Sequence, residues 1–385
     1  LLSLGIALSA SSCWMGPWPA GEMDEAQVGF LYVGPVGDHG WTKAHDVGRE
    51  YLEANLDDVT TQYQPSVIPA DAVGVMEEFI AGGDNVLITT SFDFLSATQT
   101  AAANYPDANF LNCSGFVSSP NLGSYFGRMY QVWYLAGIVA GHMTEQSGSD
   151  QIGVVGPVVI PETVRHLNAL TLGAQSVNPD VTVHVEWIHA WFDIEQEPVV
   201  TENLIIAGAD VIVSKTDTTI PLETVDGLSE TTDYPYPIFS IGYDNEDSCS
   251  FAPDTCLTAP YWNWGPLYSR LVQQMLDGTW DPHAKVWDQV KIDAEESTVY
   301  LAPINDKVPT SVVMQVEETF AMLAEPENGH FPFVGSLYDA EGDRRQSSDE
   351  EMSDDDLLRM CWYVQGVVDE TGAPAEVPGG CGGDY

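Results

Sequence analysis

The chain is poor in basic residues. Lysine and arginine together number 12 in 385 residues, against 58 aspartates and glutamates, so the formal net charge at pH 7 is −46. A surface with this charge repels nucleic-acid phosphates and anionic lipid headgroups, and no run of basic residues offsets the repulsion. We therefore expect no nucleic-acid partner. Most of the acidity is typical of a solvated surface, as in secreted or salt-adapted proteins.

Signatures of catalysis are also missing. The sequence contains no GxxxxGK(S/T) phosphate-binding loop, no GxSxG nucleophile elbow and no HExxH zinc motif. Its eight histidines are scattered, and without a CxxC pair structural zinc is not expected. The acidic residues are so numerous that no pair stands out as a general acid and base. We expect no catalytic residue, no metal and no cofactor, and hence a protein that is not an enzyme.

The apolar run at the start of the chain falls short of the ~20 residues that a membrane-spanning helix needs. Residues 1–13, LLSLGIALSASSC, resemble the core of an export signal that ends at Cys13. Small residues precede this cysteine as in a bacterial lipoprotein cleavage site, although Ala10 stands where an aliphatic residue is usual. We predict either a lipid on Cys13 or an ordinary signal peptide, with residues 14–26 as a tether.

The other cysteines favour an oxidising compartment. Cys249 and Cys256 are close enough in sequence to close a short loop. Cys361 and Cys381 can pair near the C-terminus. Cys113 ends a predicted strand and is expected to be a buried free thiol.

Strands and helices alternate along most of the chain, which is the pattern of a parallel, doubly wound α/β sheet. The predicted strands are 28–33, 59–63, 85–89, 109–113, 151–155, 181–189, 210–213 and 237–241. The predicted helices are 42–55, 71–80, 93–104, 127–146, 161–177, 195–206, 222–228 and 266–276. The rhythm restarts near residue 151, which indicates two similar Rossmann-like lobes facing each other across a ligand cleft.

This pattern predicts a division into lobes. The first lobe comprises residues 27–146 and 259–284, and the second comprises residues 147–258 and 285–335, which begin as a loop-rich region. Residues 336–385 form a C-terminal extension with one helix, for which Ser353 is the predicted N-cap and Asp354–Asp356 suit the positive end of the helix dipole. Beyond Glu370 the chain is rich in glycine and proline, which predicts a tail.

Aromatic and polar residues recur at the C-terminal ends of the predicted strands, where open α/β sheets bind ligands. They are Asp38, Trp41, Ser91 and Phe92 in the first half, and Trp191, Asp217 and Asp244 in the second. A lone tryptophan more often packs in a core, and a lone aspartate after a strand more often caps a helix. Their convergence indicates a binding site. Aromatic faces stack on a planar ring, and carboxylates accept from its N–H groups. With carboxylates as its only charged contacts, the site would reject anionic ligands and favour a neutral nucleobase or nucleoside.

Several of these residues lie in longer motifs. Residues 34–41 read GPVGDHGW and are followed by His45 and Asp46. Through such motifs the chain resembles the basic membrane lipoprotein family, the substrate-binding proteins of ABC transporters that include purine-nucleoside receptors. The resemblance is closest to a subgroup in which some members bind a free purine such as adenine. Further motifs follow in the same order over residues 28–368: TSF at 90–92, GRMYQ at 127–131, IPETVR at 160–165, WFD at 191–193, TD at 216–217, NWGP at 263–266, and a closing helical segment at 353–368.

The resemblance implies a type I periplasmic-binding fold, with two lobes that are joined by three crossovers and close on the ligand. It places a purine between aromatic walls, for which Trp41, Phe92 and Trp191 are the candidates. Asp244 resembles the family's acidic residue after the fifth strand of the second lobe, and it is our first candidate for recognising the ring edge. Asp38 and Asp217 are second-rank polar contacts.

One departure from the family bears on the ligand. Nucleoside-binding relatives often carry a lysine beyond the crossover, where this chain has Trp262, Asn263 and Trp264. The missing lysine favours a free base over a nucleoside.

The predicted function is that of an extracytoplasmic solute receptor of an ABC importer. It would bind a purine base or nucleoside, work as a monomer with permease and ATPase subunits, and reside in the cell envelope, either lipid-anchored or secreted. The alternatives are a ligand-sensing subunit of a membrane signalling protein and a nucleoside-processing enzyme. The sequence leaves the exact ligand open.

Overall fold

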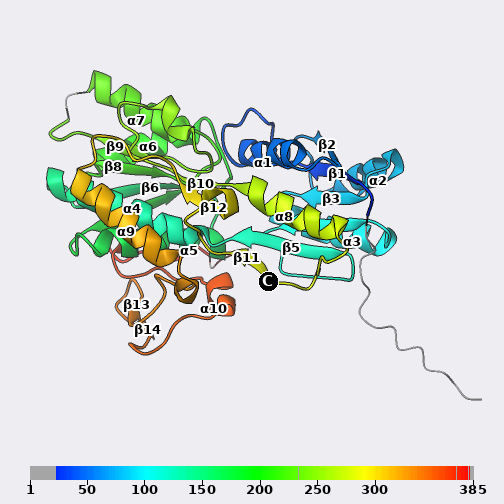
Figure 1. Ribbon diagram of the computed structural model, residues 1–385. Coiled ribbons are helices and arrows are strands. Elements are labelled where there is room, and N and C mark those ends of the chain that lie inside the picture. Colours follow the sequence, from blue (N-terminus) through cyan, green and yellow to red (C-terminus); the bar gives the residue numbers. More distant parts are fainter. Residues whose placement is uncertain (1–22, 233, 370, 380, 382–385) are drawn as a thin grey trace, which may run out of the picture.

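The computed structural model describes residues 23–232, 234–369, 371–379 and 381 (Figure 1). Two parallel sheets, with helices packed around them, form two lobes. The strand order is β11-β5-β4-β3-β1-β2 in the first sheet and β15-β7-β6-β8-β9 in the second. The predicted α/β class with two doubly wound halves is therefore confirmed. The export signal, the lipid on Cys13 and residues 14–22 of the tether lie outside the described residues.

The first sheet has hydrophobic cores on both faces. Its strands are β1 (Ala26–Leu31), β2 (Val59–Gln64), β3 (Val86–Thr89), β4 (Asn109–Cys113), β5 (Leu122–Gly127) and β11 (Val286–Asp288). Helix α1 (Trp41–Asn55) packs against α8 (Trp264–Leu276), and α2 (Ala72–Gly82) packs against α3 (Leu95–Asn104). Phe30 and Leu31 are adjacent and fully buried but belong to different cores, because successive side chains of a strand point to opposite faces.

The second sheet is covered in the same way. Its strands are β6 (Gln151–Gly156), β7 (Thr182–Trp187), β8 (Val211–Ser214), β9 (Phe239–Ile241) and β15 (Val367–Val368). Its helices are α4 (Met129–Ser147), α5 (Pro161–Gln175), α6 (Gln196–Ile206), α7 (Ile220–Thr231) and α9 (Thr310–Leu323).

Helices α4 and α5 approach closely because of two glycines. A Cβ atom at Gly137 would lie 2.1 Å from the carbonyl oxygen of Leu170, and one at Gly173 would lie 2.1 Å from that of Tyr134. No larger residue fits either position without moving a backbone. The resulting contact joins the largest helix of the second lobe to the helix that follows β6.

The chain crosses between the lobes three times, as the family resemblance implied. It passes to the second lobe between β5 and α4, returns near β10 (Pro260–Trp262), and leaves again after β11 through β12 (Val299–Leu301), which pairs with β10. Figure 1 shows the late segment α8 lying beside α1 of the first lobe. Helix α4 packs against α5 and α9 of the second lobe, so we propose that the first lobe ends near residue 128 and not at 146. Strand β11 pairs with β5 of the first lobe, so we propose that the later boundary lies near residue 288 and not at 284.

Several elements after residue 113 differ from the predictions. Strand β5 and helix α9 were not predicted, and the region after residue 285 is therefore less loop-rich than expected. The last helix, α10 (Asp354–Leu358), has the predicted Ser353 cap but ends ten residues before 368, since residues 359–368 turn back to form β15. The extension also contains the hairpin β13 (Leu337–Tyr338) and β14 (Arg344–Gln346).

The described part of the segment beyond Glu370 is held against the protein and is no free tail. The backbone N–H of Ala375 donates to the carbonyl of Val367, and Cys381 forms a disulfide with Cys361. The second predicted disulfide, Cys249–Cys256, is also present, and Cys113 is a buried free thiol as predicted.

Candidate functional site

The loop between β1 and α1 is shaped by Asp38. One carboxylate oxygen accepts from the backbone N–H groups of Gly40 and Lys43, both at 3.0 Å, and the other accepts from that of Thr42 at 2.9 Å. Both oxygens are therefore engaged at the start of α1, as in a helix cap. The structure gives Asp38 this capping contact, and a direct contact with ligand remains a prediction.

Trp41 begins α1 and is held in one orientation. Its indole N–H donates to the carbonyl of Thr90 at the end of β3, at 2.7 Å. Its ring stands edge-on to that of Trp262, with ring centres 5.6 Å apart. The half-buried ring is thereby fixed against the crossover strand β10.

Ser91 and Phe92 follow β3 in the first lobe, and Trp191 faces them from the second. The hydroxyl of Ser91 accepts from the backbone N–H of Asp93 at 3.1 Å and caps the short helix η1 (Phe92–Phe94). The Trp191 side chain donates a hydrogen bond to the Asp93 carboxylate, across the cleft. The carbonyl of Trp191 accepts from the backbone N–H of Asp217 at 3.0 Å.

Five of the seven predicted site residues line one cavity between the lobes. They are Trp41, Ser91, Phe92, Trp191 and Asp217. We call this cavity the ring pocket; its further walls include Ser114, Glu162, Lys215 and Tyr243. Its volume is about 40 Å³, which is room for about three water molecules. The ring pocket is therefore narrow in this closed conformation.

Asp244 follows Tyr243 of the pocket wall and is fully buried. Its backbone φ is +68°, and its carbonyl accepts from the N–H of Trp262 at 3.0 Å. Neither oxygen of its carboxylate has a hydrogen-bond partner among the described residues. Burial, reinforced by the nearby Asp217, raises the pKa of Asp244 well above the usual range. Neither Asp244 nor Asp38 lines the ring pocket, and a contact between Asp244 and a ligand remains a prediction.

Lys215 is a pocket residue that the sequence analysis missed. It is 4 % exposed, and its ammonium lies 4.1 Å from the centre of the Tyr243 ring and 4.0 Å from Glu162. Burial lowers its pKa, while Glu162 and Asp244 oppose that change. Lys215 follows strand β8 two residues before Asp217, so its position at a strand end was the available signal. The expectation that carboxylates are the only charged contacts is wrong.

The two lobes touch around the loop of residues 38–41. The side-chain amide of Asn245 donates to the carbonyls of His39 and Gly40, at 2.9 and 2.7 Å. A Cβ atom at Gly40 would lie 2.0 Å from the carbonyl oxygen of Asp217, so the backbones meet there. The His39 ring also contacts that of Phe251, with centres 4.7 Å apart. The cleft is therefore closed in this structure.

Within the part of the chain that the structure describes, no group of three or more histidine, cysteine or acidic side chains is placed to hold a metal. The same part contains no helix that is long and apolar enough to cross a membrane.

Comparisons with known proteins identify the family. Residues 25–325 match the family described as Bmp, ABC transporter substrate-binding protein PnrA-like. The chain belongs to this family. It is therefore an ABC transporter substrate-binding protein, as the resemblance implied, and the family match ends before the C-terminal extension.

Two curated relatives cover most of the Bmp protein. A purine-binding protein of Brucella abortus is 35% identical over 349 residues, which is 90% of this chain and 94% of the relative. A putative ABC transporter glucose-binding protein of Haloferax volcanii is 29% identical over 84% of this chain and 78% of its own length. Both relatives are binding proteins by name, and the names differ in the ligand.

Solved structures support the fold. A transcriptional activator of the comK gene from Bacillus halodurans superposes with a TM-score of 0.66 at 22% identity, covering 80% of this chain and all of the other. An ABC transporter solute-binding protein from Conexibacter woesei gives 0.63 at 20% identity, covering 78% and 97%. These likenesses show the type I periplasmic-binding fold.

Proposed function

We propose that this Bmp-family protein binds a purine base or nucleoside between its lobes and delivers it to the permease and ATPase subunits of an ABC importer. It acts as a monomeric binding protein and not as an enzyme. Its place is the cell envelope, either lipid-anchored through Cys13 or secreted. Mass spectrometry of the N-terminus of the protein isolated from its host tests the lipid on Cys13, which adds the mass of acyl chains.

The observation that carries the ligand proposal is the combination of ring surfaces with the unpartnered carboxylate of Asp244. Trp41, Phe92 and Trp191 offer aromatic faces at the ring pocket. Stacking of a base on one aromatic side chain contributes ~1–3 kcal/mol. A hydrogen bond from a ring N–H to a buried charged acceptor contributes about 1.5–3 kcal/mol. The name of the Brucella relative agrees with this chemistry.

Lys215 changes the choice between base and nucleoside. The preference for a free base rested on the missing lysine beyond the crossover. A buried ammonium nevertheless lies in the ring pocket, supplied by the end of β8. Because an ammonium donates to sugar hydroxyls as readily as to ring nitrogens, we keep both ligand classes in the proposal.

Calorimetric titration with adenine, guanine, adenosine, inosine and D-glucose tests the proposal. We expect at least one purine to bind and glucose to give no heat. The variant Trp191→Ala should lower purine affinity by roughly 5- to 150-fold, as expected for one lost stacking surface. Binding of glucose alone, or of none of these compounds, would refute the ligand assignment.

Phe192→Ala is the matched control for Trp191→Ala. Phe192 is the next residue, it is 50 % exposed, and it does not line the ring pocket. Its loss should leave purine affinity within about twofold. Equal losses in both variants would show that the loop, and not the Trp191 ring, supports binding.

A further inference from the structure

A second, larger cavity opens beside the ring pocket. It has a volume of about 510 Å³, within the range of small-molecule sites. We call it the side cavity. It shares the wall residues Phe92, Ser114, Ile160 and Glu162 with the ring pocket. The two cavities therefore adjoin each other along these residues.

The side cavity gathers basic residues in a chain that has few. Arg165, Lys285 and Arg359 line it, which is three of the 12 lysines and arginines. The guanidinium of Arg128 lies 4.4 Å from the centre of the Trp287 ring, which forms part of the wall. The cavity wall thus holds three basic and two acidic side chains, on a molecule whose net charge is strongly negative.

The acidic residues that line the side cavity either contact other side chains or are exposed to solvent. Glu162 accepts from the hydroxyl of Ser114 at 3.3 Å and faces Lys215. Asp355 is exposed at the outer rim. Lys285 is paired outside the wall, with Asp354 at 2.8 Å. His283 also lines the cavity, and its ring nitrogen is 2.8 Å from the Ser118 hydroxyl.

Two cations of the wall form no ion pair with the described residues, although the charges of Glu162 and Asp354 act on Arg165. Among the described residues, neither Arg165 nor Arg359 has an ion-pair partner within 4.0 Å. Arg165 is 2 % exposed; it donates to the carbonyl of Leu357 at 2.6 Å, and its Nε has no partner. Burial lowers the pKa of Arg165 to about 10, so the side chain keeps its charge at neutral pH. The guanidinium lies over the Trp287 ring at 5.1 Å, and an anion bound in the cavity would complete its hydrogen bonds.

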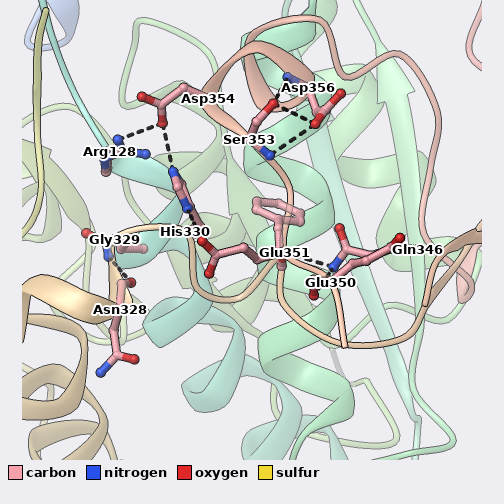
Figure 2. Close-up of polar contacts among 12 residues, drawn as sticks. Arg128, Asn328, Gly329, His330, Gln346, Glu350, Glu351, Ser353, Asp354 and Asp356 are labelled. Atoms are coloured by element: carbon pink, nitrogen blue, oxygen red, sulfur yellow. Dashed lines mark hydrogen bonds and ion pairs between the residues drawn. The ribbon is translucent and has the colours of Figure 1, made fainter. Parts of the chain in front are cut away.

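Part of the wall comes from the C-terminal extension. Asp355, Leu358 and Arg359 belong to α10 or its cap and lie beyond the family match, which ends at residue 325. Figure 2 shows Asp354 of the same helix bonded to Arg128 and His330, which fixes α10 beside the cleft. The extension therefore adds Arg359, together with Asp355 and Leu358, to the cleft of a Bmp-family protein.

We propose that the side cavity is an oxyanion subsite, which binds a phosphate or carboxylate group carried by a substituent of the ligand ring. The guanidinium groups of Arg165 and Arg359 supply donors in the planar geometry that suits both oxyanions. This proposal rests on the proposed function, and it names the ligand class as a nucleoside that bears an acidic group. It reverses the expectation that the site rejects anions.

Calorimetry with adenosine, adenosine 5′-monophosphate and adenosine-5′-carboxylic acid, at one fixed ionic strength, tests the subsite. We expect at least one acidic nucleoside to bind tenfold or more tightly than adenosine, and the two acids to distinguish phosphate from carboxylate. Arg359→Gln, at an exposed position, and Arg165→Gln should each reduce this preference to less than threefold. Equal binding of the three nucleosides, or a preference that survives both substitutions, would overturn the proposal.

The control variant is Arg344→Gln, which removes the same charge from an exposed residue of the extension that does not line the side cavity. It should keep the preference in full. If no nucleoside binds to any variant, inorganic phosphate becomes the probe of the subsite, and the proposed function itself fails only if no purine base binds either. Millimolar phosphate should then raise the Tm of the wild type and of Arg344→Gln but not of Arg359→Gln. Equal Tm shifts in all three proteins would overturn the subsite by itself.

Discussion

Asp244 has two features that are expected to destabilise the folded state. Its carboxylate is fully buried without a hydrogen-bond partner among the described residues, and its backbone adopts a positive φ. Burying an unpaired charge costs several kcal/mol or forces the group to hold a proton. Such residues are concentrated at functional sites, where a ligand supplies the missing partners. We therefore regard Asp244 as an acceptor that the closed cleft keeps ready for the ligand.

Asp244 should make the ligand-free protein less stable as the pH rises. Its pKa in the folded protein is raised above the ordinary 3.8, so the folded state keeps a proton that the unfolded state releases. The free energy of unfolding then falls as the pH rises from about 4 until it passes the folded pKa. Asp244→Asn cannot ionise, and we expect it to raise the Tm at pH 7 by about 2–5 °C while weakening purine binding.

Thermal unfolding of the wild type and Asp244→Asn between pH 4 and 8 measures this effect. Asp57→Asn serves as the control, because it removes the same charge from an exposed residue. That variant should follow the wild-type profile. Identical profiles for all three proteins would show that ionisation of Asp244 does not affect stability.

Most of the predicted site residues lie in the ring pocket, because their types and their positions after strands could be read from the sequence. The role of each side chain could not be predicted in this way. Trp41 and Trp191 were found because each lies between the end of a strand and the body of the next helix, a region that faces the cleft in this fold. Asp38 has the same sequence signal as a ligand contact, yet its oxygens cap α1. Lys215 escaped notice because a buried lysine is rare, and its partners Glu162 and Tyr243 come from distant parts of the chain.

Helix α10 is short, but its first residue holds three basic groups. Asp354 accepts from Arg128 at 2.7 Å and from His330 at 3.0 Å, and it pairs with Lys285 at 2.8 Å (Figure 2 shows the first two contacts). Although burial opposes the change, Lys285 and Arg128 lower the pKa of Asp354 to about 2. The helix thereby connects the start of α4 to the segment before β11.

Asp354→Asn should destabilise the protein in a pH-dependent manner. The lowered pKa means that the carboxylate stabilises the folded state above about pH 4, and that this contribution is lost as the pH falls towards 2. We expect a loss of ~1 kcal/mol at pH 7, because partly exposed pairs are screened by solvent. Urea unfolding at pH 7 and at pH 2.5 measures it, and the difference from the wild type should shrink at the lower pH.

Asp355→Asn provides the comparison for this prediction. Asp355 is exposed in the same turn, and within the described residues its carboxylate makes no hydrogen bond or ion pair. Its substitution should leave the free energy of unfolding within about 0.5 kcal/mol of the wild type. A loss as large as that of Asp354→Asn would mean that general charge, and not the three contacts, is responsible.

Periodicity predicted most of the longer elements, because their burial patterns are carried by many residues, but it missed helix α9 and strand β5. Strand β4 and the start of α5 lie where they were expected. Strands β11, β12 and β15 have three residues or fewer, too few for an alternating pattern to emerge. The end of α10 was also missed, since the apolar residues after Leu358 pack through a turn and a disulfide and do not continue the helical face.

The closed cleft depends on a contact between backbones of the two lobes. Gly40 lies against the backbone of Asp217, and Asn245 donates to two carbonyls of the same loop. Sequence patterns predict that the lobes face each other, but such a contact arises only from the angle at which they close. A ligand that fills the cleft shifts the protein towards this closed state by binding it more tightly than the open state.

Gly40→Ala should impair closure without unfolding either lobe. The added methyl group would lie 2.0 Å from the carbonyl oxygen of Asp217, so the lobes cannot meet as they do here. We expect a tenfold or greater loss of purine affinity, and a radius of gyration by X-ray scattering that no longer decreases when ligand is added. The Tm of the ligand-free protein should change little.

Gly37→Ala tests the same loop without the clash, because no atom lies within 4 Å of a Cβ at Gly37. It should bind and close like the wild type. Gly40→Ala with wild-type affinity and compaction would contradict the role of this contact in closure.

The edge strands β11 and β15, which complete the two sheets, lie late in the sequence and are therefore synthesised late. Strand β11 covers the edge of β5 in the first sheet, and β15 covers the edge of β7 in the second. A chain synthesised from its N-terminus cannot finish either sheet until residues 288 and 368 are available. Until then, β5 and β7 expose unpaired N–H and C=O groups. The native fold is therefore reached only when translation is nearly complete.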